Sequence, residues 1–160
     1  ANLLQDRARA RPILEKVGSK VVHCGGAGLG QAAKICNNMM AGINMVAASE
    51  GFALAERLGL SAQSLYDVVS TSSGQSTAAT SYCPVPGLTE RAASNNGYKP
   101  GFALALMLKD LKLAQSAAAS VGAASPMGAL AVQLYALHAL AGQDGNDFSH
   151  IFTMIRGAGK

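Results

Sequence analysis

Three observations predict an all-α fold for this sequence of 160 residues. Hydrophobic residues make up 49% of the chain and charged residues 14%, a balance that excludes intrinsic disorder and allows a sizeable core. From Gln31 to about Leu58 the chain has no proline, and apolar residues recur at helical spacing. After residue 25 no segment has the pattern of a strand, so the body of the chain is predicted to be helical.

The first elements are expected on either side of a glycine turn. Residues 1–16 predict a helix that is interrupted or restarted at Pro12, and residues 21–24, Val-Val-His-Cys, predict a short strand. After the Gly-Gly-Ala-Gly-Leu-Gly turn, the apolar run predicts a helix of about 27 residues and roughly 40 Å, packed on all sides. Gly59 is expected to end this helix, and Ser61 to cap the next one.

The second half of the chain alternates irregular segments with helices. Residues 71–82 are rich in serine and threonine and fit either a loop or a loose helix. Residues 83–101 hold three prolines and form the one long irregular segment, a kind that is usually functional or mobile. Helices are expected at 103–121 and 129–141, and Asp147 is expected to cap a last helix.

Composition and charge exclude several classes of protein. The net charge is +4, but the basic excess lies within the first 20 residues and aromatic residues are few, which argues against nucleic-acid binding. The chain has no uninterrupted run of 18 apolar residues, so no membrane span is expected. Cys24, Cys36 and Cys83 lack metal or disulfide spacing and are expected to be small buried residues. The isolated histidines predict no metal site, and His138 is expected to be packed.

A lysine and an asparagine inside the apolar helix suggest a site for a hydroxy acid. Lys34 and Asn38 are four residues apart and so share one helix face. Desolvation would lower the pKa of such a lysine and make it a proton donor or acceptor near neutral pH. Gly28 and Gly30 precede the pair, in a turn whose free N–H groups attract a carboxylate. A solvated lysine beside a capping asparagine is the alternative interpretation.

The same glycines fit a GxGxxA pattern, which suggests a dinucleotide-binding turn. That interpretation needs a short helix followed by a strand that ends in an acidic residue. Here the helix continues about twice as far and no strand follows, so we reject it.

Two separated motifs resemble the β-hydroxyacid dehydrogenase family. Residues 28–38, GLGQAAKICNN, match its GxGxxxKxxxN signature, and residues 99–114, KPGFALALMLKDLKLA, resemble its second marker. Residues 72–87, with a Ser-Ser-Gly turn before Pro-Val-Pro-Gly, are most similar to the 3-hydroxyisobutyrate dehydrogenase branch. The resemblance extends from about residue 10 to residue 157.

This resemblance implies a two-domain enzyme of which the chain is the second part. Residues 1–24 would be the last helix and strand of an N-terminal Rossmann domain. Residues 25–160 would be an all-α catalytic and dimerisation domain, similar to that of 6-phosphogluconate dehydrogenase and built round the long helix. The family's glycine-rich cofactor loop has no counterpart in this sequence.

The resemblance also implies roles for individual residues. Lys34 would be the catalytic acid/base, and Asn38, with Gly28 and Gly30, would bind the substrate. Three residues of the second marker would lie at the cofactor: Lys109, Phe102 and Asp110. Without the resemblance, Lys109, Asp110 and Lys112 would be read as a solvated helix face.

The implied activity is oxidation of 3-hydroxyisobutyrate to methylmalonate semialdehyde in valine breakdown, with NAD as cofactor and NADP left open. The implied partners are a small hydroxy acid and a second copy of the chain, in a homodimer or larger homo-oligomer. The location would be the cytoplasm of a bacterium or the mitochondrial matrix of a eukaryote. The alternatives are a related tartronate or succinic semialdehyde reductase, and a non-catalytic dimerisation module, which the presence of Lys34 disfavours.

Overall fold

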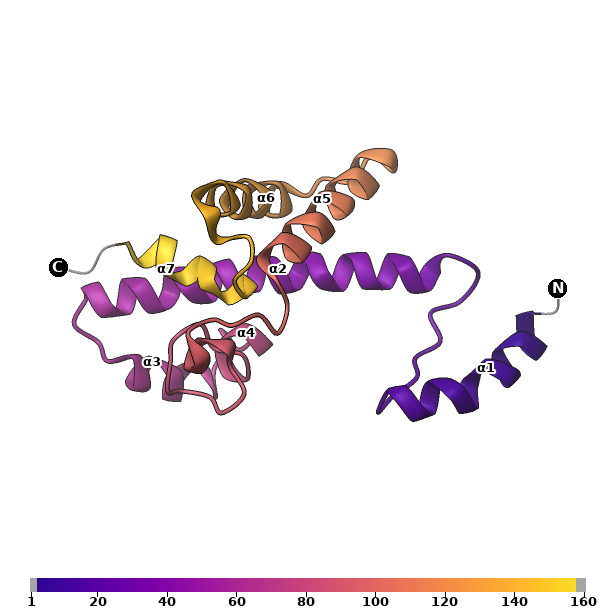
Figure 1. Ribbon diagram of the computed structural model, residues 1–160, viewed down its shortest axis with the longest axis horizontal. Helices are drawn as coiled ribbons and strands as arrows, with labels where there is room; N and C mark the ends of the chain where they lie inside the picture. Colours follow the sequence, from indigo (N-terminus) through magenta and orange to yellow (C-terminus); the bar gives the residue numbers. More distant parts are fainter. Residues whose placement is uncertain (1–2, 158–160) are drawn as a thin grey trace. The chain divides into compact units, whose positions relative to one another are not determined.

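The computed structural model describes residues 3–157 and, for side chains, residues 9–157 (Figure 1). The chain divides into two compact units, residues 1–34 and 35–160, and each is described by itself. Among the described residues all regular elements are helices, and the only β pairing is an isolated bridge between Ala103 and Asp147. The predicted all-α class is therefore confirmed.

The first unit contains α1 (Leu3–Val17) and the start of α2 (Leu29–Arg57). Helix α1 continues through Pro12, so the expected interruption is wrong. The strand expected at 21–24 is also wrong, because these residues have no strand assignment. A strand is held by hydrogen bonds to a neighbouring strand, and the described part of the chain offers none.

Helix α2 and its boundaries confirm the prediction of one long helix. It is 29 residues long and ends before Gly59, which has a φ of +81°. The Gly59 N–H donates to the Glu56 carbonyl at 3.1 Å, and the Leu60 N–H donates to the Ala55 carbonyl at 2.9 Å. This pair of hydrogen bonds is typical of a glycine C-cap. Ser61 then caps α3 (Ala62–Val69) by accepting from the Ser64 N–H at 3.1 Å.

Within the second unit, α2 is packed on part of its surface only. Figure 1 shows α5, α6 and α7 on one side of it and α3 and α4 on the other. Met40 and Leu54 of α2 remain 60% and 59% exposed. The expectation of a helix packed on all sides is therefore wrong for a single chain, because its other helices are too few and short to surround α2. The buried positions are Gly42, Met45, Val46, Ser49, Phe52, Ala53 and Ala55.

The Ser/Thr-rich segment and the proline-containing segment after it are more ordered than a free loop. The first contains the short helix α4 (Thr77–Thr80), and the second contains the 3₁₀ turn η1 (Ala93–Asn96). Ser94 Oγ donates to the Cys83 carbonyl and Tyr98 Oη to the Pro84 carbonyl, each at 2.8 Å. These bonds tie both ends of the proline-containing segment to each other.

The remaining helices lie where the sequence predicts them. They are α5 (Leu104–Ser120), α6 (Pro126–His138), the π-helical turn η2 (Ala139–Gln143), the 3₁₀ turn η3 (Phe148–His150) and α7 (Ile151–Arg156). Asp147 caps η3 as predicted, because its carboxylate accepts from the Ser149 N–H at 3.0 Å. His138 is buried, also as predicted.

Close packing of α5 on α2 organises the core. A Cβ at Gly42 of α2 would lie 3.1 Å from both Leu111 Cδ2 and Met107 Sδ of α5, so the absent side chain allows this approach. The main buried cluster comprises Met45, Val46, Ala78, Leu104, Met107, Leu111, Ala131, Tyr135 and Ile151.

Two of the three cysteines are not buried as the sequence predicts. Only Cys83 is buried, whereas Cys24 and Cys36 are exposed, so the expectation of three buried cysteines is wrong for two of them. Cys36 is exposed because it lies on the part of α2 that the second unit leaves uncovered.

No helix within the described range is both long and apolar enough to cross a membrane.

Candidate functional site

The structure joins the two sequence motifs through three side chains. Asn38 of α2 donates from Nδ2 to Asp110 Oδ2 of α5 at 2.7 Å, across 72 residues of sequence. The other oxygen of Asp110, Oδ1, lies 3.1 Å from Lys109 Nζ. The solvated-face interpretation is therefore wrong for Asp110, which is only 7% exposed. Lys109 and Lys112 are exposed.

These contacts fix the orientation of the Asn38 amide. A carboxylate only accepts hydrogen bonds, so the amide nitrogen of Asn38 must face Asp110 and its oxygen must face away. That oxygen receives a long bond of 3.3 Å from Asn37 Nδ2. One N–H and one lone pair of the Asn38 amide remain available, which suits a hydroxyl or carbonyl group of a ligand.

Lys34 lies one turn before Asn38 in α2, at the spacing that places two side chains on one helix face. Its side chain is exposed, so the desolvated lysine expected from the apolar sequence is not found in this chain. The neighbouring residues of the first turns are alanine, glutamine and cysteine, which are themselves exposed and provide no cover.

The two glycines stand at the start of the same helix. Gly28 has a φ of +86°, a conformation that favours glycine, and its carbonyl accepts the Ala32 N–H at 3.0 Å. Nothing described lies within 4 Å of a Cβ built on Gly28 or Gly30. The Leu29 N–H donates to the Gly26 carbonyl at 3.2 Å, so the first turn offers a ligand the later N–H groups of a helix start, such as that of Gly30.

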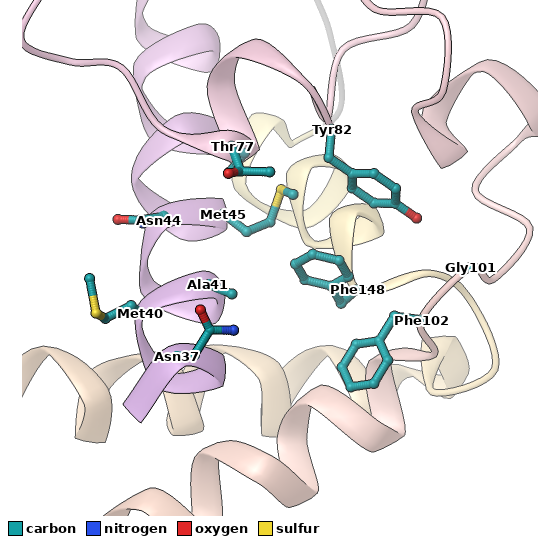
Figure 2. Close-up of a pocket in the computed structure, with 11 residues that line it drawn as sticks. Asn37, Met40, Ala41, Asn44, Met45, Thr77, Tyr82, Gly101, Phe102 and Phe148 are labelled. Carbon is teal, nitrogen blue, oxygen red and sulfur yellow. The ribbon is translucent and has the colours of Figure 1, made fainter. Parts of the chain in front are cut away.

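A pocket of about 570 Å³ lies beside Asn37 on α2. Figure 2 shows Phe102 and Phe148 facing Asn37 and Ala41 across it, with Tyr82 and Thr77 at its other end. Its lining includes no charged side chain: Asn37, Met40, Ala41, Asn44, Met45, Thr77, Ala78, Tyr82, Gly101, Phe102 and Phe148. Such a lining suits an uncharged part of a ligand with a few hydrogen-bonding groups.

A second cleft, of about 460 Å³, lies beside Lys109 on α5. Lys112 and Ser116 line it together with Asp144 and apolar residues. Two cations and a hydroxyl match the oxygen-rich, negatively charged parts of a dinucleotide. The residues present thus fit the edge of such a cofactor, although no glycine-rich strand–turn–helix unit occurs in the described chain to hold its pyrophosphate.

Sequence reasoning did not select several residues of this region. Asn37 adjoins Asn38 in the first motif and Tyr82 lies in the 72–87 segment of the resemblance, but neither is predicted as a site residue from the sequence. Asp147 was expected only as a helix cap, yet it also accepts from the Phe102 N–H at 2.9 Å. No local signal could have revealed that contact, because its partners are 45 residues apart.

The chain is similar to known proteins over most of its length. The chain matches a family model described as NAD-binding of NADP-dependent 3-hydroxyisobutyrate dehydrogenase over residues 28–155. It is 49% identical over 148 residues to a probable 3-hydroxyisobutyrate dehydrogenase of Mycobacterium tuberculosis, covering 92% of this chain and 50% of that protein. The identity to 3-hydroxyisobutyrate dehydrogenase of Pseudomonas aeruginosa is 47% over 152 residues, covering 94% of this chain and 51% of that protein. The identity to mitochondrial 3-hydroxyisobutyrate dehydrogenase of Homo sapiens is 42% over 149 residues, covering 93% of this chain and 44% of that protein.

Solved structures give the same result. A structure of Mycobacterium tuberculosis 3-hydroxyisobutyrate dehydrogenase with L-serine has a TM-score of 0.88 at 49% identity, covering 94% of this chain and 51% of that one. One from Salmonella typhimurium has a TM-score of 0.75 at 27% identity, covering 92% and 50%. The chain thus spans about half the length of the relatives it matches. The expected nicotinamide dinucleotide is confirmed at the level of the family model.

Proposed function

Because the chain belongs to the 3-hydroxyisobutyrate dehydrogenase family, we propose that it is the helical part of an enzyme that oxidises 3-hydroxyisobutyrate to methylmalonate semialdehyde. The reaction would serve valine breakdown. The observation that carries the proposal is the contact of Asn38 with Asp110, which brings the second motif against the first. Residues 1–24 would belong to an N-terminal dinucleotide-binding domain, and residues 25–160 would form the catalytic and dimerisation domain.

The acid/base role falls to Lys34. In the oxidation, Lys34 Nζ would take the proton from the substrate hydroxyl, and in the reverse reaction it would return it to the carbonyl oxygen. Because the Lys34 side chain is exposed in this chain, other parts of the complete enzyme would have to cover it and exclude water from the reacting groups.

Substrate orientation falls to Asn38 and the glycine turn. The Asn38 amide, held by Asp110, keeps one N–H and one lone pair for the substrate. The Gly30 N–H, in the first turn of the helix after Gly28, would receive the substrate carboxylate. The carboxylate and the reacting carbon would then lie along one face of the first turns of α2.

The cofactor would meet this chain at α5. Lys109 and Lys112 would hold its negatively charged or ribose oxygens, Asp110 would keep Lys109 in place, and Phe102 would contact it from the loop before α5. When bound, the dinucleotide accepts the hydride from the substrate carbon. The choice between NAD and NADP depends on residues outside this chain.

A second copy of the chain is the proposed partner. Met40 and Leu54 leave apolar surface on α2 exposed, and surface of this kind usually marks a subunit interface with two-fold symmetry. Sedimentation should give at least a dimer, whereas a mass near the 16.3 kDa of one chain would contradict the interface. The enzyme would be cytoplasmic in a bacterium and in the mitochondrial matrix of a eukaryote.

Replacement of Lys34 by alanine in the complete enzyme tests the proposal. We expect kcat for 3-hydroxyisobutyrate to fall by about 10²–10⁴, the usual effect of losing a proton-transfer group. The dissociation constant of the cofactor should change little. Lys20→Ala, which removes an exposed lysine near the same helix in sequence, is the matched control. A loss of less than about tenfold would remove Lys34 from the chemistry.

A further inference from the structure

Asp147 is a buried carboxylate that connects three segments of the second unit. Its side chain is fully buried, and one oxygen, Oδ2, accepts three hydrogen bonds. The donors are Tyr82 Oη at 2.8 Å, the Gly101 N–H at 3.0 Å and the Phe102 N–H at 2.9 Å. The same carboxylate therefore holds the end of α4 and the loop before α5.

The other oxygen of Asp147 has a separate, local function. Oδ1 accepts from the Ser149 N–H at 3.0 Å and from Ser149 Oγ at 2.7 Å, which caps η3. None of the ion pairs found in the described residues includes Asp147. Convergent N–H and O–H donors are the usual way to stabilise a buried carboxylate without a cation.

The segments that Oδ2 holds carry the aromatic wall of the pocket in Figure 2. Tyr82 stacks on Phe148 with ring centroids 5.6 Å apart, and Phe148 meets Phe102 edge to face at 6.0 Å. Burial, and then the hydrogen bond to Asp147, raises the pKa of Tyr82 well above its usual value, so its hydroxyl stays a donor. The carboxylate thus fixes the rings that face α2.

Gly101 shows how tightly this arrangement is packed. A Cβ at Gly101 would lie 2.7 Å from Tyr82 Oη and 3.7 Å from Asp147 Oδ2. A side chain here would push the Tyr82 hydroxyl away from the carboxylate, although Gly101 itself is exposed. The absence of a side chain is therefore required by the hydrogen bonds and not by burial.

We propose that Asp147 is a positioning residue of the enzyme, which acts through Oδ2 by fixing Phe102 in the wall of the site. This inference rests on the proposed function, in which Phe102 contacts the bound ligands. Asp147 itself touches neither substrate nor cofactor, since its two oxygens are occupied by five donors of the protein. Its removal should therefore reproduce the loss of Phe102 and add little to it.

Two substitutions at position 147 separate the positioning role from the capping role. In Asp147→Ser, the hydroxyl can still cap η3 but is too short to reach the loop, so Phe102 is released. In Asp147→Asn, the amide oxygen can still accept from Tyr82 Oη and from the Gly101 and Phe102 N–H groups, and the NH₂ group can donate to Ser149 Oγ. The NH₂ group cannot accept from the Ser149 N–H, so this variant loses that capping bond instead. The serine variant should therefore impair the reaction, and the asparagine variant should largely restore it.

A double-mutant cycle in the complete enzyme tests the inference. The wild-type rate with 3-hydroxyisobutyrate tests the proposed function first, independently of position 147. Asp147→Ser should then lower kcat/KM by about 10–100-fold, the cost of a misplacement of roughly 1 Å near the reacting groups. In a Phe102→Ala background the same substitution should change kcat/KM by no more than about twofold.

The controls address folding and charge. Asp67→Asn, which alters an exposed carboxylate of α3 that accepts from Gln63 Nε2 at 2.8 Å, should leave kcat/KM unchanged. If thermal unfolding shows that Asp147→Ser is not folded at the assay temperature, Gly101→Ala replaces it in the same cycle with the same expectation. An equal loss in both Phe102 backgrounds, or no loss at all, would overturn the positioning role.

Discussion

Replacing Asp110 by alanine should lower the free energy of unfolding by about 1.5–3 kcal/mol, the usual value of a hydrogen bond to a charged group. Asp110 is 7% exposed and its Oδ2 accepts a hydrogen bond from Asn38 Nδ2 at 2.7 Å, so this bond is short and lies at a buried carboxylate. The ion pair with Lys109 adds at most about 1 kcal/mol, because the Lys109 side chain is 57% exposed. The bond to Asn38 is therefore the larger of these two contributions.

A double-mutant cycle with Asn38→Ala measures this bond directly. Denaturant unfolding should give a coupling energy of about 1.5–3 kcal/mol between the two positions, and Asp110→Asn should recover much of the loss because it keeps an acceptor. The matching decrease in Tm is about 2–4 °C for each kcal/mol at this chain length. A coupling energy below about 0.5 kcal/mol would mean that the stability losses of the two single substitutions simply add, so the contact itself would contribute nothing measurable.

Three further substitutions test other contacts. Lys109→Ala should raise the KM for the cofactor about 10–150-fold, the usual effect of losing a hydrogen bond to a charged group. An unchanged KM would show that Lys109 is a solvated residue of the helix surface and does not bind the cofactor. Gly42→Val should lower the free energy of unfolding by about 1–3 kcal/mol, because its Cβ would lie 3.1 Å from side-chain atoms of α5. Gly51→Val is the control, since a Cβ at Gly51 has nothing within 4 Å. Burial lowers the pKa of both His138 and His150, so the folded protein binds fewer protons and loses stability as pH falls below about 6.5. Denaturant unfolding from pH 8 to pH 5 should show this loss, and it should be smaller in His138→Gln.

The sequence predicts helix ends well where the determinants are local. Gly59 and Ser61 mark the boundary between α2 and α3 because a glycine C-cap and a serine N-cap involve residues within one turn of each other. The interruption predicted at Pro12 was wrong because the helix continues on both sides of the proline. The strand predicted at 21–24 was wrong for a different reason. A strand depends on a partner elsewhere, and local composition cannot supply one.

The candidate site divides in the same way. The spacing of Lys34 and Asn38 follows from one helix and could be predicted, but the contact of Asn38 with Asp110 spans 72 residues and follows from packing. The exposure of Lys34 could not be predicted either, because apolar neighbours in sequence do not determine which face of a helix is covered. The resemblance to a family names Asp110 as a cofactor residue, a role that stays a prediction, and it gives no indication of the contact with Asn38.

Gly42 links the stability of the core to the geometry of the site. It lies one turn after Asn38 on α2, and it receives Met107 and Leu111, which flank Asp110 on α5. A side chain as large as valine at this position would crowd Met107 and Leu111, and we expect it to shift α5 and lengthen the 2.7 Å bond between Asn38 and Asp110. Because interiors are close-packed, that displacement cannot be absorbed locally. Variants of Gly42 should therefore lose the Asn38–Asp110 coupling in proportion to their loss of stability.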